Sequence, residues 1–409
     1  MAELVSVEEH LERILVAVAP LPDFPQPLLD ALGLPAAEDV VSPIPLPSFD
    51  NSAMDGYAVV AADVASATED DPVWLPVVGE IGAGQASLLA LSPGTAAKIM
   101  TGAPVPKGCD AVVPYEWTDR GVAKVRITQA PTVGQHLRHV GEDVAEGDLL
   151  VERGTVLGPR HLGLLASVGR ATVRARPRPR VVVISTGSEL RDAGSSLGHD
   201  SIYDGNSYLL AAAARAAGAL AYRVGIVPDE PAAFLDALSD QLVRADLVVT
   251  SGGVSQGDFD VVKEALAPLG TVWFGGVAMQ PGKPQGFGFV GGEGEARVPI
   301  FTLPGNPVSS YLSFQQFVLP ALRTMMGRTP VSRPTRRARV THDIRSPEGR
   351  RQFVRAEWSE DGAVTPVGGH GSHLIGDLAH SNALIVVPED VIEVPKGSEV
   401  AVLLLDRDF

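Results

Sequence analysis

The feature that most constrains the fold is a regular alternation of strand-like and helix-like segments between residues 180 and 328. Short runs rich in Val and Ile, such as RVVVIST at 180–186 and DLVVTSGG at 246–253, alternate with longer segments of helical periodicity. Strands of this composition are typically buried on both faces, and their alternation with helices predicts a parallel sheet covered on both sides. We therefore expect a doubly wound, mostly parallel α/β domain over residues 179–328.

The flanking segments have different patterns. Residues 46–140 contain short β-type runs separated by Gly and Pro, which predicts a β-rich domain inserted into a helical or mixed N-terminal domain of linker type. That linker-type domain would be built from residues 1–45 and 141–178. Four further β-like runs predict a small β domain over residues 329–409. The whole chain is thus expected to be a multidomain α/β protein.

Charge and composition exclude several classes of protein. The net charge is −16, which argues against nucleic-acid binding, and we expect the one basic run, residues 169–180, to be a solvated linker. No stretch approaches the ~20 apolar residues of a membrane span, and the acidic N-terminus lacks the basic region of a secretory signal. The single cysteine, Cys109, excludes an internal disulfide. A cytoplasmic location is therefore expected.

Three predicted strands end in turns of small residues: STG at 185–187, SGGVS at 251–255 and PGNPVSS at 304–310. The carboxyl ends of the strands in an open α/β sheet line one crevice, and glycine lets the backbone approach a ligand there. Helix N-termini that follow such turns favour anions, so we predict a phosphate-bearing ligand. The predicted ligand-binding residues of these turns are Thr186, Gly187, Ser251, Gly252, Gly253, Ser255, Pro304, Gly305 and Asn306.

Acidic residues recur in the loops of the same region. Glu189, Asp229 and Asp260 follow predicted strands, and carboxylates near a phosphate fit a bridging Mg²⁺ ion. Asp229 and Asp260 have an alternative explanation, because each precedes a predicted helix and could cap it. Glu189 has no such explanation. Asn206 is expected to cap the helix that it opens.

Two further patterns concern anion and metal binding. PGKPQGFG at 281–288 resembles a phosphate loop but departs from the Walker A motif, so Lys283 is either a rigidly presented cation or part of a surface turn. His370, His373 and His380 form no recognised metal-binding motif, which argues against a zinc site.

A loop in the predicted insertion carries two carboxylates without a cation nearby in sequence. Asp50 and Asp55 lie in LPSFDNSAMDGYAVV at 46–60, and Arg13 is the only Lys or Arg before Lys98. The carboxylates are either solvated by water or meet an incoming metal or substrate.

Seven motifs, in order along the chain, resemble those of the molybdopterin molybdenumtransferases. This family, the molybdenum insertases, is similar also to the C-terminal part of gephyrin, and the resemblance spans the chain. The motifs are FDNSAMDGYAV (49–59), MTGAPVPKGCDAVV (100–113), GED (141–143), STGSEL (185–190), SGGVSQGDFDVVK (251–263), PGKPQGFG (281–288) and LPGNPVSS (303–310).

The resemblance implies that molybdate is inserted into adenylated molybdopterin and that AMP is released, with Mg²⁺ or another divalent cation. It also implies an elongated homodimer whose cleft uses a loop from the partner subunit's insertion, with the molybdopterin adenylyltransferase as a candidate protein partner. Asp50 is then expected to fix its own loop by bonding nearby backbone amides. The residues assigned by resemblance are Asp55, Glu189, Asp229 and Asp260 as catalytic, Asp55, Glu189 and Asp229 as metal-binding, and Thr101, Asp143, Lys283, Arg355 and Ser372 as substrate-binding.

The sequence departs from the family at two places. Ser188 stands where the family usually has Asp, and Gly276 and Gln280 stand where some relatives carry lysines that help to bind the oxyanion. These departures keep open a tungstate-inserting paralogue. A non-catalytic pterin-binding scaffold is the other alternative.

Overall fold

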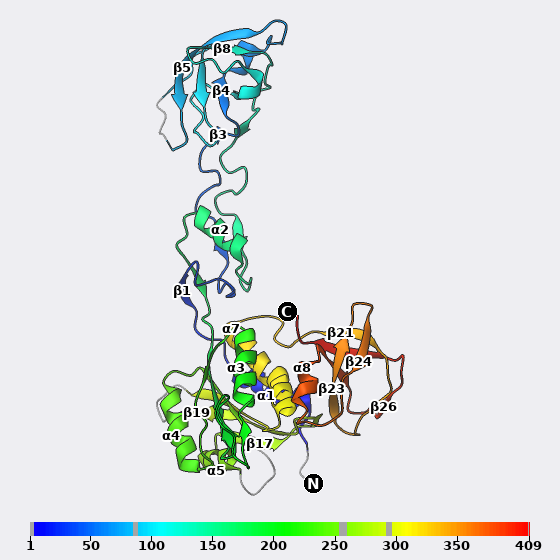
Figure 1. Ribbon diagram of the computed structural model, residues 1–409. Helices are drawn as coiled ribbons and strands as arrows, with labels where there is room; N and C mark the ends of the chain where they lie inside the picture. Colours follow the sequence, from blue (N-terminus) through cyan, green and yellow to red (C-terminus); the bar gives the residue numbers. More distant parts are fainter. Residues whose placement is uncertain (1–3, 85–88, 253–259, 292–296, 408) are drawn as a thin grey trace.

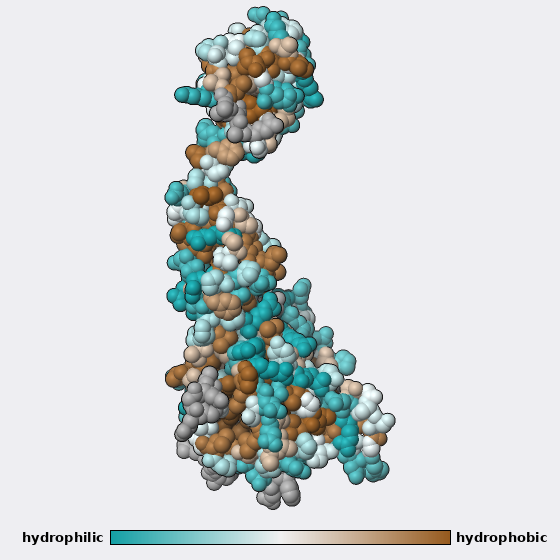
Figure 2. Space-filling view, turned by 90° about the vertical axis from the view of Figure 1, so that its left-hand side faces the viewer, coloured by the Kyte–Doolittle hydropathy of each residue, from teal (hydrophilic) through white to brown (hydrophobic). Residues whose placement is uncertain are grey.

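The computed structural model describes residues 4–84, 89–252, 260–291, 297–407 and 409, which form an elongated molecule (Figure 1). Both ends of the chain lie in a broad base, and a small lobe lies at the opposite end of the molecule. A narrow neck joins this lobe to the rest (Figure 2). None of the helices within the described ranges is long and apolar enough to cross a membrane.

The base contains a six-stranded sheet in the order β15-β12-β16-β20-β19-β17. The first four strands are mutually parallel, whereas β19 and β17 run antiparallel to their neighbours. The predicted doubly wound, mostly parallel α/β fold is therefore confirmed. The strands are β12 (Arg180–Ser185), β15 (Leu220–Arg223), β16 (Leu247–Ser251), β17 (Val272–Gly276), β19 (Pro284–Val290) and β20 (Val298–Leu303).

Helices cover both faces of this sheet because successive side chains of a buried strand point to opposite sides. Val181 and Val183 of β12 belong to one core cluster, and Val182 and Ile184 belong to the other. The first face is covered by α1 (Val7–Ala17), α3 (Asn206–Ala216), α6 (Pro307–Ser313) and α7 (Leu319–Met326), and the second by α4 (Pro231–Leu242) and α5 (Val261–Leu266).

Two details of these helices follow from local chemistry. Ser6 precedes α1, and its Oγ accepts a hydrogen bond from the Glu9 amide at 3.1 Å. A π-helical stretch, Phe314–Val318, joins α6 to α7 just before Pro320, whose ring nitrogen has no hydrogen to donate within a helix.

The distal lobe, which we define as the part of the chain from β3 to β9, contains a five-stranded sheet in the order β7-β4-β6-β5-β8. Gly56 is required at its centre, because a Cβ there would lie 2.0 Å from the Val113 carbonyl oxygen. The elements are β3 (Asn51–Ser52), β4 (Gly56–Val59), η1 (Ala61–Val64), β5 (Val73–Ile81), β6 (Ala96–Ile99), β7 (Ala111–Pro114), η2 (Tyr115–Trp117), β8 (Lys124–Ile127) and β9 (Leu137–Arg138).

Between the distal lobe and the base, segments from before and after the lobe pair with each other. β1 (Phe24–Pro27) pairs with β11 (Thr172–Ala175), and β2 (Val40–Val41) pairs with β10 (Leu149–Val151). Together with α2 (Pro159–Ser167) they enclose a small apolar core of their own. We call this part of the chain the middle lobe. In each of its two strand pairs, one strand leads toward the distal lobe and the other leads back from it.

The C-terminal lobe is a six-stranded sheet in the order β18-β23-β24-β21-β27-β25, and its closure is barrel-like because β25 also pairs with β23. One of these strands, β18, belongs in sequence to the preceding α/β domain. The sequence pattern did not predict this strand. The elements are β18 (Met279–Gln280), β21 (Thr335–Val340), β23 (Arg351–Trp358), β24 (Ala363–Pro366), α8 (Ile375–Ala379), β25 (Ala383–Val387) and β27 (Glu399–Leu404). Shorter pieces elsewhere in the base are β13 (Leu190–Arg191), β14 (Ile202–Tyr203), η3 (Ala267–Leu269), β22 (Ile344–Arg345) and β26 (Glu393–Val394).

Candidate functional site

The order of the strands reverses at β12, because β15 lies on one side of it and β16 on the other. Ligands of open α/β sheets bind at such a switch point, beyond the carboxyl ends of the strands. Here those ends carry the turns that begin at Ser185 and Ser251, and the Thr186 amide donates to the Ser251 carbonyl oxygen at 3.4 Å. Gly252 has a φ of +94°, and a Cβ on it would lie 3.0 Å from the Thr186 carbonyl oxygen, so glycine is needed there. Gly253 and Ser255 lie outside the described residues.

Asn206 joins two of the strand-end turns. Its Nδ2 donates to Ser251 Oγ at 2.8 Å and to the Gly305 carbonyl oxygen at 2.6 Å. The prediction that Asn206 caps α3 is wrong, because Asn206 is already the first residue of the helix. The Ser207 amide donates instead to the Asp204 carboxylate at 3.0 Å. Asn206 is thereby free to hold the turns at the ends of β16 and β20 together.

A buried polar network lies behind these turns. Asp204 is only 2% exposed and accepts hydrogen bonds from Ser185 Oγ at 3.2 Å and from Ser207 Oγ at 2.5 Å. Arg223 Nε donates to Ser207 Oγ at 2.7 Å, and the Arg223 guanidinium lies 3.8 Å from Asp204. The sequence pattern did not single out Asp204, although its position three residues before Ser207 is typical of a capping residue.

The three carboxylates predicted for this region differ in their surroundings. Asp229 does not cap α4, because its Oδ2 accepts a hydrogen bond from the Ser188 amide at 2.7 Å. Glu189 is exposed and lies over Gly187, where a Cβ would come within 2.9 Å of both carboxylate oxygens. Asp260 precedes α5, and its side chain makes no capping hydrogen bond.

Several buried polar atoms around this crevice lack partners. Both carboxylate oxygens of Asp260 and the Thr186 hydroxyl are buried without a hydrogen bond in the part of the chain that the structure describes. Burial raises the pKa of Asp260, and Lys263 offsets this in part. Unsatisfied polar atoms are rare in folded proteins, so the Thr186 hydroxyl beside the turn at Gly252 indicates a place for a polar ligand.

A pocket of about 310 Å³ lies beside this crevice, between the α/β domain and the C-terminal lobe. It contains two cations, Lys283 and Arg350, and neither forms an ion pair within the described ranges. The Val308 amide donates to the Ser372 carbonyl oxygen at 3.1 Å, which joins the two walls. The lining residues are Met279, Gln280, Pro281, Gly282, Lys283, Pro284, Pro304, Gly305, Asn306, Ser309, Arg350, His370 and Ser372.

Arg355 lies behind this pocket and does not line it. It is buried, and it donates to the carbonyl oxygens of Gly371, at 3.0 Å, and of Gly369. Its guanidinium also lies 3.8 Å from Asp377, and burial lowers its pKa. Arg355 therefore supports the loop that carries Ser372, and the arginine on the pocket wall is Arg350, which the sequence pattern did not single out.

The two positions that lack lysines differ in the structure. Gln280 lines the pocket, so a longer cationic side chain could extend into it. Gly276 lies elsewhere on β17, where a Cβ would be 2.6 Å from Leu4 Cδ2 and 3.3 Å from Lys283 Cε. Both contacts are with the ends of flexible side chains, so a side chain at residue 276 would displace Leu4 and lie beside Lys283.

Asp55 lies in the distal lobe with Thr101 as its partner. Its Oδ1 accepts hydrogen bonds from the Thr101 amide and hydroxyl, each at 2.7 Å, and these bonds lower the pKa of Asp55. Asp50 does not bond the amides of its own loop as predicted, because its Oδ1 accepts from the Val140 amide at 2.7 Å. Asp143 lines a hollow at the neck together with Pro47, Arg138 and Glu142.

One chain does not bring all the predicted residues together. The distal lobe that carries Asp55 lies at the opposite end of the molecule from the α/β domain that carries Glu189 and Asp229 (Figure 1). Across the described residues, no three Asp, Glu, His or Cys side chains gather as a metal site would require. Among the described residues, a metal-binding group is therefore formed neither by Asp55, Glu189 and Asp229 nor by His370, His373 and His380.

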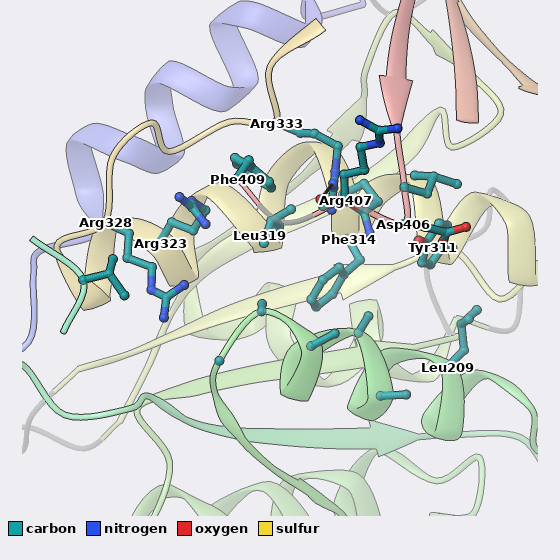
Figure 3. A pocket seen from close by; sticks show the side chains of 18 residues that line it. Leu209, Tyr311, Phe314, Leu319, Arg323, Arg328, Arg333, Asp406, Arg407 and Phe409 are labelled. Atoms are coloured by element: carbon teal, nitrogen blue, oxygen red, sulfur yellow. Dashed lines mark hydrogen bonds between the residues drawn. The ribbon is translucent and has the colours of Figure 1, made fainter. Parts of the chain in front are cut away.

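A hollow of about 1050 Å³ is separate from the strand-end turns. It lies between α3 and the α6–α7 helix, and Figure 3 shows Arg323, Arg333 and Phe409 along one wall. Arg323 and Arg333 lie over the Phe409 ring at 4.0 and 4.7 Å. These arginines hold the end of the chain against the helices and take no part in the crevice.

The switch-point crevice and the adjoining cationic pocket are the features of an α/β protein with a ligand site at the carboxyl ends of its strands. Three family models match the chain in succession: the MoeA N-terminal region (domain I and II) over residues 5–169, a probable molybdopterin binding domain over 182–324, and the MoeA C-terminal region (domain IV) over 337–405. The chain belongs to the molybdopterin molybdenumtransferase family.

Relatives and solved structures agree with this membership. The chain is 47% identical to molybdopterin molybdenumtransferase 2 of Mycobacterium tuberculosis, over 97% of this chain and 98% of the relative. It is 36% identical to the molybdopterin molybdenumtransferase of Haemophilus influenzae, over 92% of both chains. The crystal structure of a molybdopterin biosynthesis MoeA protein from Pyrococcus horikosii matches with a TM-score of 0.83 and 33% identity, over 99% of this chain and 100% of that one.

Proposed function

We propose that this chain inserts molybdate into adenylated molybdopterin and releases AMP. The observation that carries the proposal is that the turn at 304–306 borders both the switch-point crevice and the cationic pocket. A phosphate-bearing pterin in the crevice and an oxyanion in the pocket would therefore lie next to each other. Family membership and the names of the relatives support this reaction over a non-catalytic scaffold.

The crevice is proposed to hold the pterin ligand. A phosphate can approach the turns at Gly187 and Gly252 closely because neither glycine carries a side chain, although the amides of both glycines already donate to carbonyl oxygens of the protein. The unpartnered Thr186 hydroxyl and the Asp260 carboxyl supply further polar contacts. Burial raises the pKa of Asp260, and its carboxylate oxygens can accept hydrogen bonds from a ligand.

The cationic pocket is proposed to hold molybdate. Lys283 and Arg350 supply positive charge, and Ser372, Ser309 and Asn306 supply neutral polar groups. Charge is needed locally because the chain carries a net −16, which disfavours the approach of a dianion. Arg355 acts indirectly in this account, by fixing the loop that carries Ser372.

A divalent cation fits these residues if the substrate supplies part of its ligands. Glu189 has an exposed carboxylate, and Asp229 keeps one oxygen outside its bond to Ser188. Mg²⁺ commonly uses one or two carboxylates together with substrate phosphates and water, so a cluster of three protein ligands is not required. The ion would neutralise the charge of the phosphate. The carboxylates of Glu189 and Asp229 would hold the ion in position.

A homodimer is proposed because the distal lobe, which carries Asp55 and Thr101, lies at the opposite end of the molecule from the crevice. A second copy that places its distal lobe against the crevice would add the Asp55 carboxylate to Glu189 and Asp229. The same lobe would bring its own Arg138, and Asp143 of the neck, nearer to the ligand. A cytoplasmic location and contact with the molybdopterin adenylyltransferase complete the proposal.

The test is to incubate the purified protein with adenylated molybdopterin, Mg²⁺ and either molybdate or tungstate, and to measure AMP. Molybdate-dependent AMP release that is lost in Lys283→Ala is the expected result. Release with tungstate alone would indicate the tungstate paralogue. Pterin binding without AMP release for either oxyanion would contradict the proposed enzyme and favour a scaffold.

A further inference from the structure

His370 lies on the wall of the cationic pocket, next to two residues already proposed to contact the anion. It shares the lining with Lys283, Arg350 and Ser372. Its ring has one protein partner within the described residues: Nδ1 lies 3.1 Å from Nε2 of Gln352. The other ring nitrogen, Nε2, is on the side of the imidazole that faces away from Gln352.

Gln352 is well placed to fix the orientation of this ring. It is 3% exposed on β23, where its backbone pairs with Gln280 on one side and Val387 on the other. A buried side chain on a strand paired on both sides has little freedom to move. The histidine on the exposed loop is therefore anchored at Nδ1 by a rigid group.

The hydrogen bond decides where the ring carries its proton. With the Gln352 amide nitrogen facing the ring, Nδ1 accepts, so the neutral ring has its hydrogen on Nε2. Gln352 Oε1 is then buried without a partner among the described residues. This is the orientation that the structure has, and in it the Nε2–H donor faces away from Gln352.

We propose that His370 is a further anion-binding residue, which donates a hydrogen bond from Nε2 to an oxyanion held between Lys283 and Arg350. The inference rests on the proposed function, since it takes the pocket to be the oxyanion site. It gives the pocket a further donor, in addition to Lys283 and Arg350, where Gln280 stands in place of a lysine. No carboxylate lines this pocket among the described residues, so an anion meets only cations and neutral polar groups there.

His373 provides a matched control on the same loop. It is exposed and is not part of the pocket lining, so its removal changes the composition of the loop without removing a pocket donor. Gln352→Leu tests the anchor, because it keeps the approximate size of the side chain and removes the partner of Nδ1.

The experiment is calorimetric titration of molybdate into the full-length protein and its variants, with thermal unfolding to confirm that each is folded. We expect His370→Ala to weaken molybdate binding about tenfold or more, Gln352→Leu to weaken it by a smaller factor, and His373→Ala to leave it unchanged. Lys283→Ala tests, independently of His370, whether molybdate binds in this pocket. If Lys283→Ala weakens binding and His370→Ala does not, the pocket holds the anion and the role of His370 is refuted. If neither variant changes the affinity, or the wild type binds no molybdate, the anion site is elsewhere and both proposals fail.

Discussion

The Asp55 carboxylate accepts two hydrogen bonds from Thr101, one from the backbone amide and one from the hydroxyl, each at 2.7 Å. The amide contributes most to the lowered pKa of Asp55, and the hydroxyl adds to it. The carboxylate thus stays charged and fixed in direction, although it is exposed on the distal lobe. A fixed, exposed charge that forms no ion pair among the described residues of its own lobe is suited to act on a ligand of a second chain.

Asp55→Asn is expected to abolish AMP release while leaving the affinity for adenylated molybdopterin within about tenfold, roughly 1.4 kcal/mol. The substitution keeps the shape of the side chain and removes the charge. Thr101→Val should reduce the rate less, because the backbone amide still bonds Asp55. Rates of AMP release and pterin titrations measure both effects. A rate near that of the wild type for Asp55→Asn would reduce Asp55 to a residue that fixes its loop.

Asn206→Ala is expected to weaken binding of the pterin ligand about tenfold, because both hydrogen bonds between the turns at Ser251 and Gly305 are lost. The side chain is only partly buried, so we expect a small change in the melting temperature. Leu209→Ala on the same helix faces the hollow of Figure 3 and serves as the control. Equal ligand affinity in Asn206→Ala and wild type would show that the turns do not need this link.

Gln280→Lys is expected to tighten molybdate binding by about tenfold or more, because it adds a cation to the pocket that contains Lys283 and Arg350. Gly276→Lys should instead leave molybdate binding without this gain, since its Cβ would displace Leu4 and crowd Lys283, at 2.6 Å from Leu4 Cδ2 and 3.3 Å from Lys283 Cε. Calorimetric titration and thermal unfolding distinguish the two results. Unchanged molybdate affinity in a folded Gln280→Lys protein would place the anion away from residue 280.

His10 is expected to make the fold sensitive to acid. Its ring is 1% exposed between Trp273 and Phe317, and burial, with a smaller effect of Arg13, lowers its pKa from 6.5 to about 4. Between these values the unfolded chain binds more protons than the folded one, so stability falls as the pH falls. From pH 7 to pH 5 this amounts to about 2 kcal/mol.

Urea unfolding at both pH values, at one protein concentration, measures this effect. His10→Phe keeps an aromatic ring and removes the titrating group, so its loss of stability on acidification should be smaller by about the same amount. An equal loss in the two proteins would mean that His10 does not titrate differently in the folded and unfolded states.

The topology of the α/β domain could be predicted because its strands are local runs of Val and Ile whose neighbours are helices. The turns after β12, β16 and β20 could be predicted for the same reason. The choice between Asp204 and Asn206 as the residue that caps α3 depends on where the first turn of this helix lies. A periodic pattern does not locate that turn to a single residue. The pattern places Arg350 and Arg355 near the same predicted strand, and only the docking of the C-terminal lobe decides that one lines the pocket and the other bonds carbonyl groups. β18 was missed because its two residues pair with a strand some seventy positions later.

The most direct test of the account is a mixed dimer of Asp55→Asn and Glu189→Gln chains, because the two residues lie in lobes at opposite ends of one chain. If each cleft combines the distal lobe of one chain with the α/β domain of the other, the mixed dimer has one cleft with both carboxylates and one with neither. The measurement is molybdate-dependent AMP release by mixed dimers purified with two different tags, compared with each single variant and with wild type. The account predicts about half of the wild-type rate for the mixed dimer and almost none for either variant alone. Verified mixed dimers that release no AMP would contradict a cleft shared between two chains.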